Sequence, residues 1–218
     1  MKPIKALTIL ALAAVIGSCN EVQPVAQRWS EEKANEWYAA REWPVGCDYV
    51  PAYAGNQIQM WQPSTFDPAE IDKELGWAED LGFNSVRIFL HDKVWSADRD
   101  AFFANIEKFL EIADSHGISS LVTLFTNGGS RDRYVDEKIS PIPGIHNGIW
   151  AQTPGIETVN DPSQWDWVKK YEQDVLDHFK DDKRIIAWCL YNEPENVPAC
   201  HTYPLLKKVF EWAREVNP

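Results

Sequence analysis

The sequence lacks the usual signatures of nucleotide and metal sites. It contains no phosphate-binding loop, no dinucleotide fingerprint and no His-Glu-x-x-His pair. Its four cysteines show no spacing typical of zinc ligands. We therefore expect neither a metal nor another cofactor.

Basic residues are the minority among the charged side chains. The 21 lysines and arginines stand against 33 aspartates and glutamates, which gives a formal net charge of -12. Such a surface repels phosphate backbones, so nucleic acid is not an expected partner.

The chain also lacks an apolar run long enough to cross a bilayer, although its first 18 residues resemble a secretory signal. Lys2 and Lys5 precede an apolar stretch over 6–16, which is too short to span a membrane. The sequence "IGSC" before and at Cys19 resembles a bacterial lipobox, in which the cysteine is lipidated; a plain signal peptide cut nearby is the alternative. We favour an exported cell-envelope lipoprotein, facing the periplasm or the cell surface and anchored to the membrane by its lipid. Residues 19–28 would then be a tether and 29–218 the folded part.

Three further cysteines are an odd number for disulfides. Cys47 and Cys189 lie in apolar runs, where a cysteine is usually a small buried side chain. A bridge between Cys189 and Cys200 stays open. Tryptophan is abundant, with 11 copies, and exposed indoles bind flat apolar ligand faces. Trp77, Trp188 and Trp212 are expected to serve packing.

After a short helix begun by Ser30, a strand and then a helix follow one another four times. The expected strands cover 45–50, 83–90, 119–126 and 185–191. The first expected helix begins at Asp67, the second runs from near 96 to near 116, the third follows 161–164, and the last runs from 203 to near 216. The first three strands start 38 and then 36 residues apart (45, 83, 119), a spacing close to that of a (β/α)8 barrel.

We therefore predict the α/β class and a (β/α)8 TIM barrel, of which this chain supplies about the first four units. A doubly wound sheet is the rival, but the first strand is not followed by its glycine-rich turn. A complete four-stranded domain is the other alternative, and it would leave hydrophobic strand edges open. A full barrel takes about 250 residues.

The stretch "AWCLYNEPEN" places polar residues at the end of the fourth expected strand. Function in such barrels lies at the C-terminal ends of strands. Glu193 would point into the mouth as a general acid, Asn192 would bind a substrate hydroxyl, and Pro194 would fix the turn.

"NEP" on the fourth strand and "VRIFLH" on the second resemble the retaining glycoside hydrolases with (β/α)8 barrels. The most similar group is the cellulase-like family 5, including bacterial proteins often described as xylanases, over roughly residues 28–218. The resemblance implies that Glu193 is the acid/base, that Asn192 binds the sugar 2-hydroxyl and that Arg87 supports the nucleophile.

Two features depart from that family. The third strand ends in "LFTNGG", where a histidine is usual, and the nucleophile would belong to a seventh strand beyond residue 218. Retaining hydrolysis needs two carboxyl groups about 5–5.5 Å apart across the sugar. Glu195 would share the side of Glu193, and Asp48 could at best suit a wider, inverting geometry. We therefore expect the chain alone to be inactive.

Other candidate residues follow the strands on the same face. His91 alternates with Arg87 and either binds substrate or packs internally, and Asp92 is expected to serve the turn. Trp61, Trp95 and Trp150 could stack on sugar rings; Trp150 is the strongest because it shares a long polar loop with His146.

The predicted function is hydrolysis of β-linked glycosidic bonds in an oligo- or polysaccharide such as β-glucan, xylan or mannan. A surface lipoprotein that binds glycan without cutting it is the alternative, and a structural domain is a third reading. A glutamate at the tip of a seventh strand would favour the enzyme.

Overall fold

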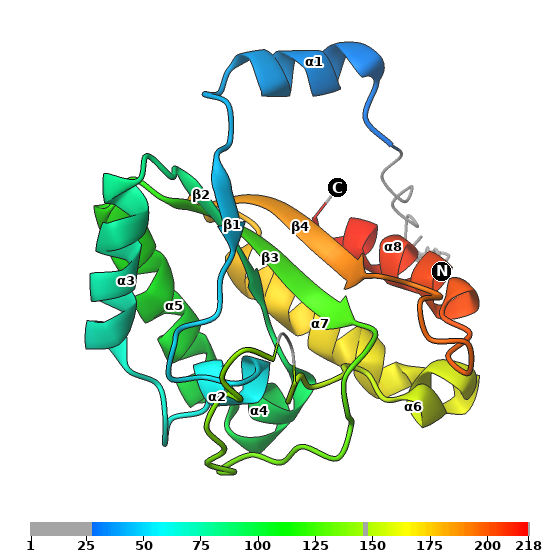
Figure 1. Cartoon of the computed structure of the whole chain (residues 1–218). Helices are drawn as coiled ribbons and strands as arrows, with labels where there is room; N and C mark the ends of the chain where they lie inside the picture. Colours follow the sequence, from blue (N-terminus) through cyan, green and yellow to red (C-terminus); the bar gives the residue numbers. More distant parts are fainter. Residues whose placement is uncertain (1–27, 146–147, 218) are drawn as a thin grey trace, which may run out of the picture.

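The computed structural model describes residues 28–145 and 148–217 (Figure 1). The expected leader over 1–18, the lipidation candidate Cys19 and the loop candidate His146 lie outside the described residues.

A parallel sheet of four strands forms the centre of the structure. The strands are β1 (Gly46–Asp48), β2 (Ser85–Phe89), β3 (Ser119–Thr126) and β4 (Ile185–Asn192). They lie side by side in sequence order, and every neighbouring pair is parallel. This order, with a helical crossover after each strand, confirms the prediction of a partial (β/α)8 barrel.

The helices divide into a long set and a short set. The longer helices are α1 (Glu31–Ala39), α3 (Pro68–Asp80), α5 (Arg99–Ser115), α7 (Trp165–Phe179) and α8 (Tyr203–Val216); the shorter ones are α2 (Gln57–Trp61), α4 (Asp92–Ala97), α6 (Ile156–Asn160) and a 3-10 turn, Pro162–Gln164. Figure 1 shows α3, α5, α7 and α8 against one face of the sheet, α2, α4 and α6 towards the C-terminal ends of the strands, and α1 standing off at the other end.

Local capping explains where the helices begin. Asp67 accepts hydrogen bonds from the backbone N–H groups of Ala69 and Glu70, and Pro68 occupies the first turn, where its missing N–H costs nothing. Ser30 caps α1 in the same way. The helix expected over 96–116 is present as α5, which begins a few residues later, whereas the short helix α4 before it was not expected. His91 caps α4, and Asp98 ends α4 and caps α5, because its carboxylate accepts from the N–H of Ala101.

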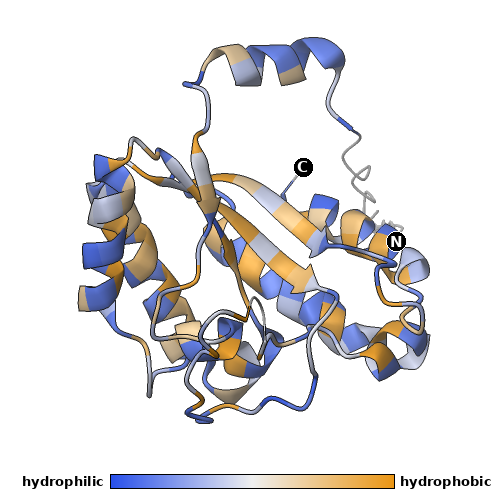
Figure 2. Ribbon diagram, in the orientation of Figure 1, coloured by the Kyte–Doolittle hydropathy of each residue, from blue (hydrophilic) through white to orange (hydrophobic). Residues whose placement is uncertain are grey.

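The core lies between the sheet and the long helices. Figure 2 shows apolar strands and apolar inward stripes on helices whose outer faces are polar. Phe102, Ile106 and Phe109 of α5 and Ile71 of α3 are fully buried there. Burying each such side chain contributes roughly 1.5–3 kcal/mol to the free energy of unfolding.

The other face of the sheet has no helix over it in Figure 1, and this corrects one cysteine assignment. Cys47 is exposed rather than buried, because β1 is a short edge strand. Cys189 is half-buried and Cys200 is buried, and all three thiols are free, so no bridge joins Cys189 to Cys200. Trp77 also departs from its packing assignment, since it is 57% exposed on α3.

Candidate active site

A cleft opens where the four strands end. Its volume is about 420 Å³. Its lining residues come from every strand or the segment after it: Asp48, Val50, Arg87, Phe89, Asn127, Gly128, Gly129, Trp150, Asn192 and Glu193. Five sequence-predicted residues, including the rival Asp48, therefore meet in one cavity.

Arg87 of β2 is fixed at the floor of this cleft. Its Nε donates to the hydroxyl of Thr123 at 3.1 Å, and Nη2 donates to Oδ1 of Asn192 at 2.5 Å. Nη1 lies 3.6 Å from Oδ1 of Asp48, and the guanidinium stands over the ring of Phe89. A guanidinium held on several sides is preorganised to orient an oxygen-rich partner, such as a carboxylate.

Asn192 is oriented from both ends of its amide. Its Oδ1 accepts from Arg87, and its Nδ2 donates to Oγ1 of Thr126 at 3.0 Å. The Thr126 hydroxyl donates in turn to the carbonyl of Asn127, so its oxygen acts as the acceptor for Asn192. The amide therefore has one N–H left to offer to a ligand.

Glu193 follows β4 directly and lines the cleft. Its side chain is exposed, and Oε2 accepts from Nδ2 of Asn196 at 2.7 Å. Its φ of 51° lies in the left-handed region, which costs a non-glycine residue on the order of 1–3 kcal/mol. Such strain is characteristic of sites where a side chain must be aimed in one direction.

Glu195 has a different task, although it is only two residues away. Its Oε1 accepts from the backbone N–H of Tyr203 at 2.6 Å and from the hydroxyl of Thr202 at 3.1 Å. It thereby caps the first turn of α8 and does not line the cleft. Asp48 stands on the opposite edge strand from β4, so the cleft lies between Asp48 and Glu193.

Trp150 forms one wall of the cleft. Its ring meets Phe89 edge to face, with centroids 5.1 Å apart, and the side chain is half-buried. The backbone of Gly129 packs against it so closely that an added Cβ would lie 2.3 Å from the carbonyl oxygen of Trp150. Gly129 also has a φ of 81°, so only glycine fits there.

Two other aromatic candidates do not lie in the cleft. Trp61 is fully buried: its indole N–H donates to the carbonyl of Phe89 at 2.7 Å, and its ring packs on Phe109. A ring with no exposed face cannot stack on a sugar, so the substrate-binding prediction for Trp61 is wrong. Trp95 is half-buried and lines a different pocket.

His91 is also a packing residue. β2 ends at Phe89, so His91 no longer continues the alternation with Arg87. Its Nδ1 accepts from the N–H of Lys93, and the side chain is 1% exposed. Burial lowers the pKa of His91 to about 4, so the ring is neutral at pH 7. The substrate-binding alternative for His91 is therefore wrong.

Sequence reasoning missed a buried ion pair behind the cleft. Asp92 was assigned to turn chemistry, but it is 4% exposed and accepts two hydrogen bonds of 2.7 Å from Arg131. Burial raises its pKa, yet the guanidinium outweighs this and holds the pKa of Asp92 below its usual range. The partners are 39 positions apart, and no local signal links them. Within 28–145 and 148–217, no group of three His, Cys, Asp or Glu side chains is placed to hold a metal ion.

Comparison with known proteins finds similar solved structures but no match by sequence. No family model and no curated protein matches the chain. Solved structures do match. The exo-β-1,4-mannosidase Op5Man5 from Opitutaceae bacterium strain TAV5 superposes with a TM-score of 0.60 at 21% identity, over 79% of this chain and 30% of that one. The chain has the fold of solved glycoside hydrolases.

Two further structures agree on this fold. A GH5_18 protein from Streptomyces cattleya, solved with Manβ1-4GlcNAc, matches with a TM-score of 0.55 at 16% identity, over 80% of this chain and 43% of that one. A GH5_18 protein from Bifidobacterium longum subsp. longum, in complex with the same disaccharide, gives 0.55 at 15% identity, over 81% and 41%. This chain therefore spans less than half the length of these three structures.

Proposed function

We propose that this chain forms the first half of a retaining glycoside hydrolase that cleaves β-linked glycosidic bonds. The observation that carries the proposal is the meeting of Arg87, Asn192 and Glu193 in one cleft at the C-terminal ends of parallel strands. The fold shared with solved glycoside hydrolases supports it. Those structures are named for mannosides, so β-1,4-mannosides are the first substrates to test, ahead of xylan and β-glucan.

Each residue has a role that fits its contacts. Glu193 would protonate the leaving oxygen and then, as a carboxylate, take a proton from water. Asn192 would donate its free N–H to the sugar 2-hydroxyl. Arg87, with one side towards Asn192 and another towards Asp48, would orient and stabilise the nucleophile carboxylate, and Trp150 would stack on a sugar face.

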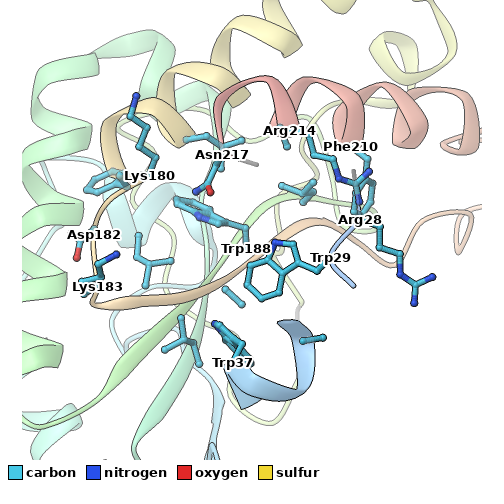
Figure 3. A pocket seen from close by; sticks show the side chains of 18 of the residues that line it. Arg28, Trp29, Trp37, Lys180, Asp182, Lys183, Trp188, Phe210, Arg214 and Asn217 are labelled. Carbon is cyan, nitrogen blue, oxygen red and sulfur yellow. The ribbon is translucent and has the colours of Figure 1, made fainter. Parts of the chain in front are cut away.

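The nucleophile would come from further β/α units joined to β4, and the edge of this strand that pairs with no described strand supports this. Ile185, Ile186 and Trp188 are only half-buried, which is unusual in a parallel strand. A hollow of about 770 Å³ lies beside β4, between α1, α7 and α8. Figure 3 shows Trp29, Trp37 and Trp188 around it. Apolar side chains beside the unpaired edge of a strand could bind a fifth strand and its helix.

The decisive experiment compares this 218-residue chain with the same chain extended through its natural continuation. We expect hydrolysis of β-1,4-mannan, xylan or β-glucan only by the extended protein, with the β-anomer formed first in the NMR spectrum of the products. Equal activity of the two proteins would contradict a nucleophile beyond residue 218. An α-anomer formed first would point to an inverting enzyme with Asp48 as base, and binding without hydrolysis would favour the glycan-binding alternative.

We also propose that the protein is exported and lipidated at Cys19. This rests on the sequence alone. Among the described helices, none is both long and apolar enough to cross a membrane. In bacteria fed labelled palmitate, the unchanged protein should become labelled and sediment with membranes, and Cys19→Ser should abolish both. Label retained in the Cys19→Ser protein would exclude this anchor.

A further inference from the structure

A second pocket opens outside the cleft, between the second and third β/α units. It has a volume of about 550 Å³ and lies between α4, the loop after β3 and the start of α7. It is lined by Asp92, Lys93, Trp95, Ser96, Ala97, Arg131, Tyr134, Val135, Thr158 and Trp167, none of which lines the cleft. Because α4 follows β2 and the loop follows β3, the pocket opens towards the same end of the sheet as the cleft.

The loop that forms one wall is tied firmly to α4. Nζ of Lys93 donates to the carbonyls of Arg131 and Arg133, each at 2.6 Å. Arg131 makes two hydrogen bonds to Asp92, whose carboxylate also accepts one from the hydroxyl of Thr153. The wall is therefore formed before any ligand arrives, which lowers the entropy lost on binding.

Aromatic side chains form the other walls. Trp95 is held by its indole N–H, which donates to Asp174 at 2.7 Å, and by an edge-to-face contact with Tyr171. Tyr134 is 62% exposed, with the ammonium of Lys93 4.9 Å from its ring centre. Trp167 is half-buried and packs against the hydrophobic core. Each of these side chains combines a flat apolar surface with a polar tip.

The charged side chains of the pocket already have partners within the protein. Among its described lining residues, the charged side chains are Asp92, Lys93 and Arg131. The aspartate and the arginine neutralise each other, and the ammonium is engaged by two carbonyls, with one N–H remaining. A ligand that fits must offer an apolar face to the rings and hydroxyl groups to Lys93, Ser96 and Trp167.

We propose that this pocket binds a neutral sugar ring of the same glycan, outside the cleft, and so holds a polymer near the site of cleavage. A pyranose has the required combination of an apolar C–H face and a rim of hydroxyls, and the cavity volume lies within the common range for small-ligand sites. Two linked weak sites raise the effective affinity for a long chain but not for a short one. The identity of the glycan rests on the proposed function, but the pocket lies wholly within the described part.

The test follows the indole N–H signal of Trp167 by NMR in the ¹⁵N-labelled chain, assigned by its disappearance in Trp167→Phe. The probes are the β-1,4-linked hexasaccharides of mannose, glucose and xylose. We expect at least one to shift the Trp167 signal in a saturable way and to leave that of Trp77 on α3 unmoved. No shift with any of the three overturns the proposal, and a shift caused by inorganic phosphate instead identifies an anion site and also overturns it.

A second measurement separates this proposal from the catalytic one. Trp167→Ala should weaken retardation in a gel containing the soluble polysaccharide about tenfold, the scale of one lost stacking contact. The matched variant Trp77→Ala should migrate as the unchanged protein. Unchanged retardation of Trp167→Ala refutes the second site even if the extended protein hydrolyses glycan, whereas a shifted Trp167 signal without hydrolysis refutes only the proposed enzyme.

Discussion

Replacing Glu193 by glutamine should lower kcat on a polysaccharide by about 10²–10⁴-fold in the extended protein, the usual contribution of a general acid. Glutamine keeps the size of the side chain and can still bind a hydroxyl, so affinity for the glycan should change little. An activated aryl glycoside needs no proton at its leaving group, so its first step should be spared. Initial rates with both substrates, beside a binding titration, measure these effects.

Glu195→Gln provides the matched control. Glu195 is two residues away, with the same charge and a left-handed φ of 64°, but it caps α8 instead of lining the cleft. Turnover of this variant should match that of the unchanged protein, with a stability loss of about 1 kcal/mol for the weakened cap. If the two variants lose turnover equally, or if Glu193→Gln keeps it, Glu193 is not the acid/base.

The strands and the long helices could be predicted because their signals are local. β3 and α8 have the predicted bounds. β3 is a run of apolar residues with high strand propensity, and α8 has an apolar stripe that follows Pro198 and Pro204. The short helix α4 was not expected, and the start of α5 was placed a few residues too early, although Asp98 is a residue type typical of an N-cap.

The errors at the site have a different cause. Trp61 follows β1, as a cleft residue should, but α2 folds over the strand ends and every one of its five residues is buried. The Asp92–Arg131 pair and the second pocket join segments far apart in the chain. Strand-end position predicts which residues are near the mouth, whereas only the three-dimensional packing decides which of them face the cavity.

A buried glutamate on α7 should make the stability of the folded chain depend strongly on pH. Glu172 is fully buried beside Val168 and Val175, and neither carboxylate oxygen accepts a hydrogen bond from any described residue. Burial raises its pKa from 4.5 to about 9, and the nearby charge of Glu215 adds to the rise. At pH 7 the folded chain therefore holds a proton that the unfolded chain has released.

The direction of the pH dependence follows from this difference. Below pH 4.5 the Glu172 carboxyl is protonated in both the folded and the unfolded state. Its burial then lowers the free energy of unfolding least. Between pH 4.5 and about 9 only the unfolded state ionises, so the free energy of unfolding falls as pH rises and levels off above 9. Each pH unit in this window costs about 1.4 kcal/mol, or roughly 3 kcal/mol by pH 7.

Glu172→Gln should remove that slope. Glutamine cannot ionise, so the variant should unfold at higher urea concentration than the unchanged chain at pH 7 and pH 9, with little difference at pH 4.5. Glu111→Gln is the control, because Glu111 is exposed on α5 and only pairs with Lys108 on the surface. Equal pH slopes for the unchanged chain and Glu172→Gln would mean that the Glu172 carboxyl ionises in the folded state. In that case α7 would have to open to water at this point, against the full burial of its inner face.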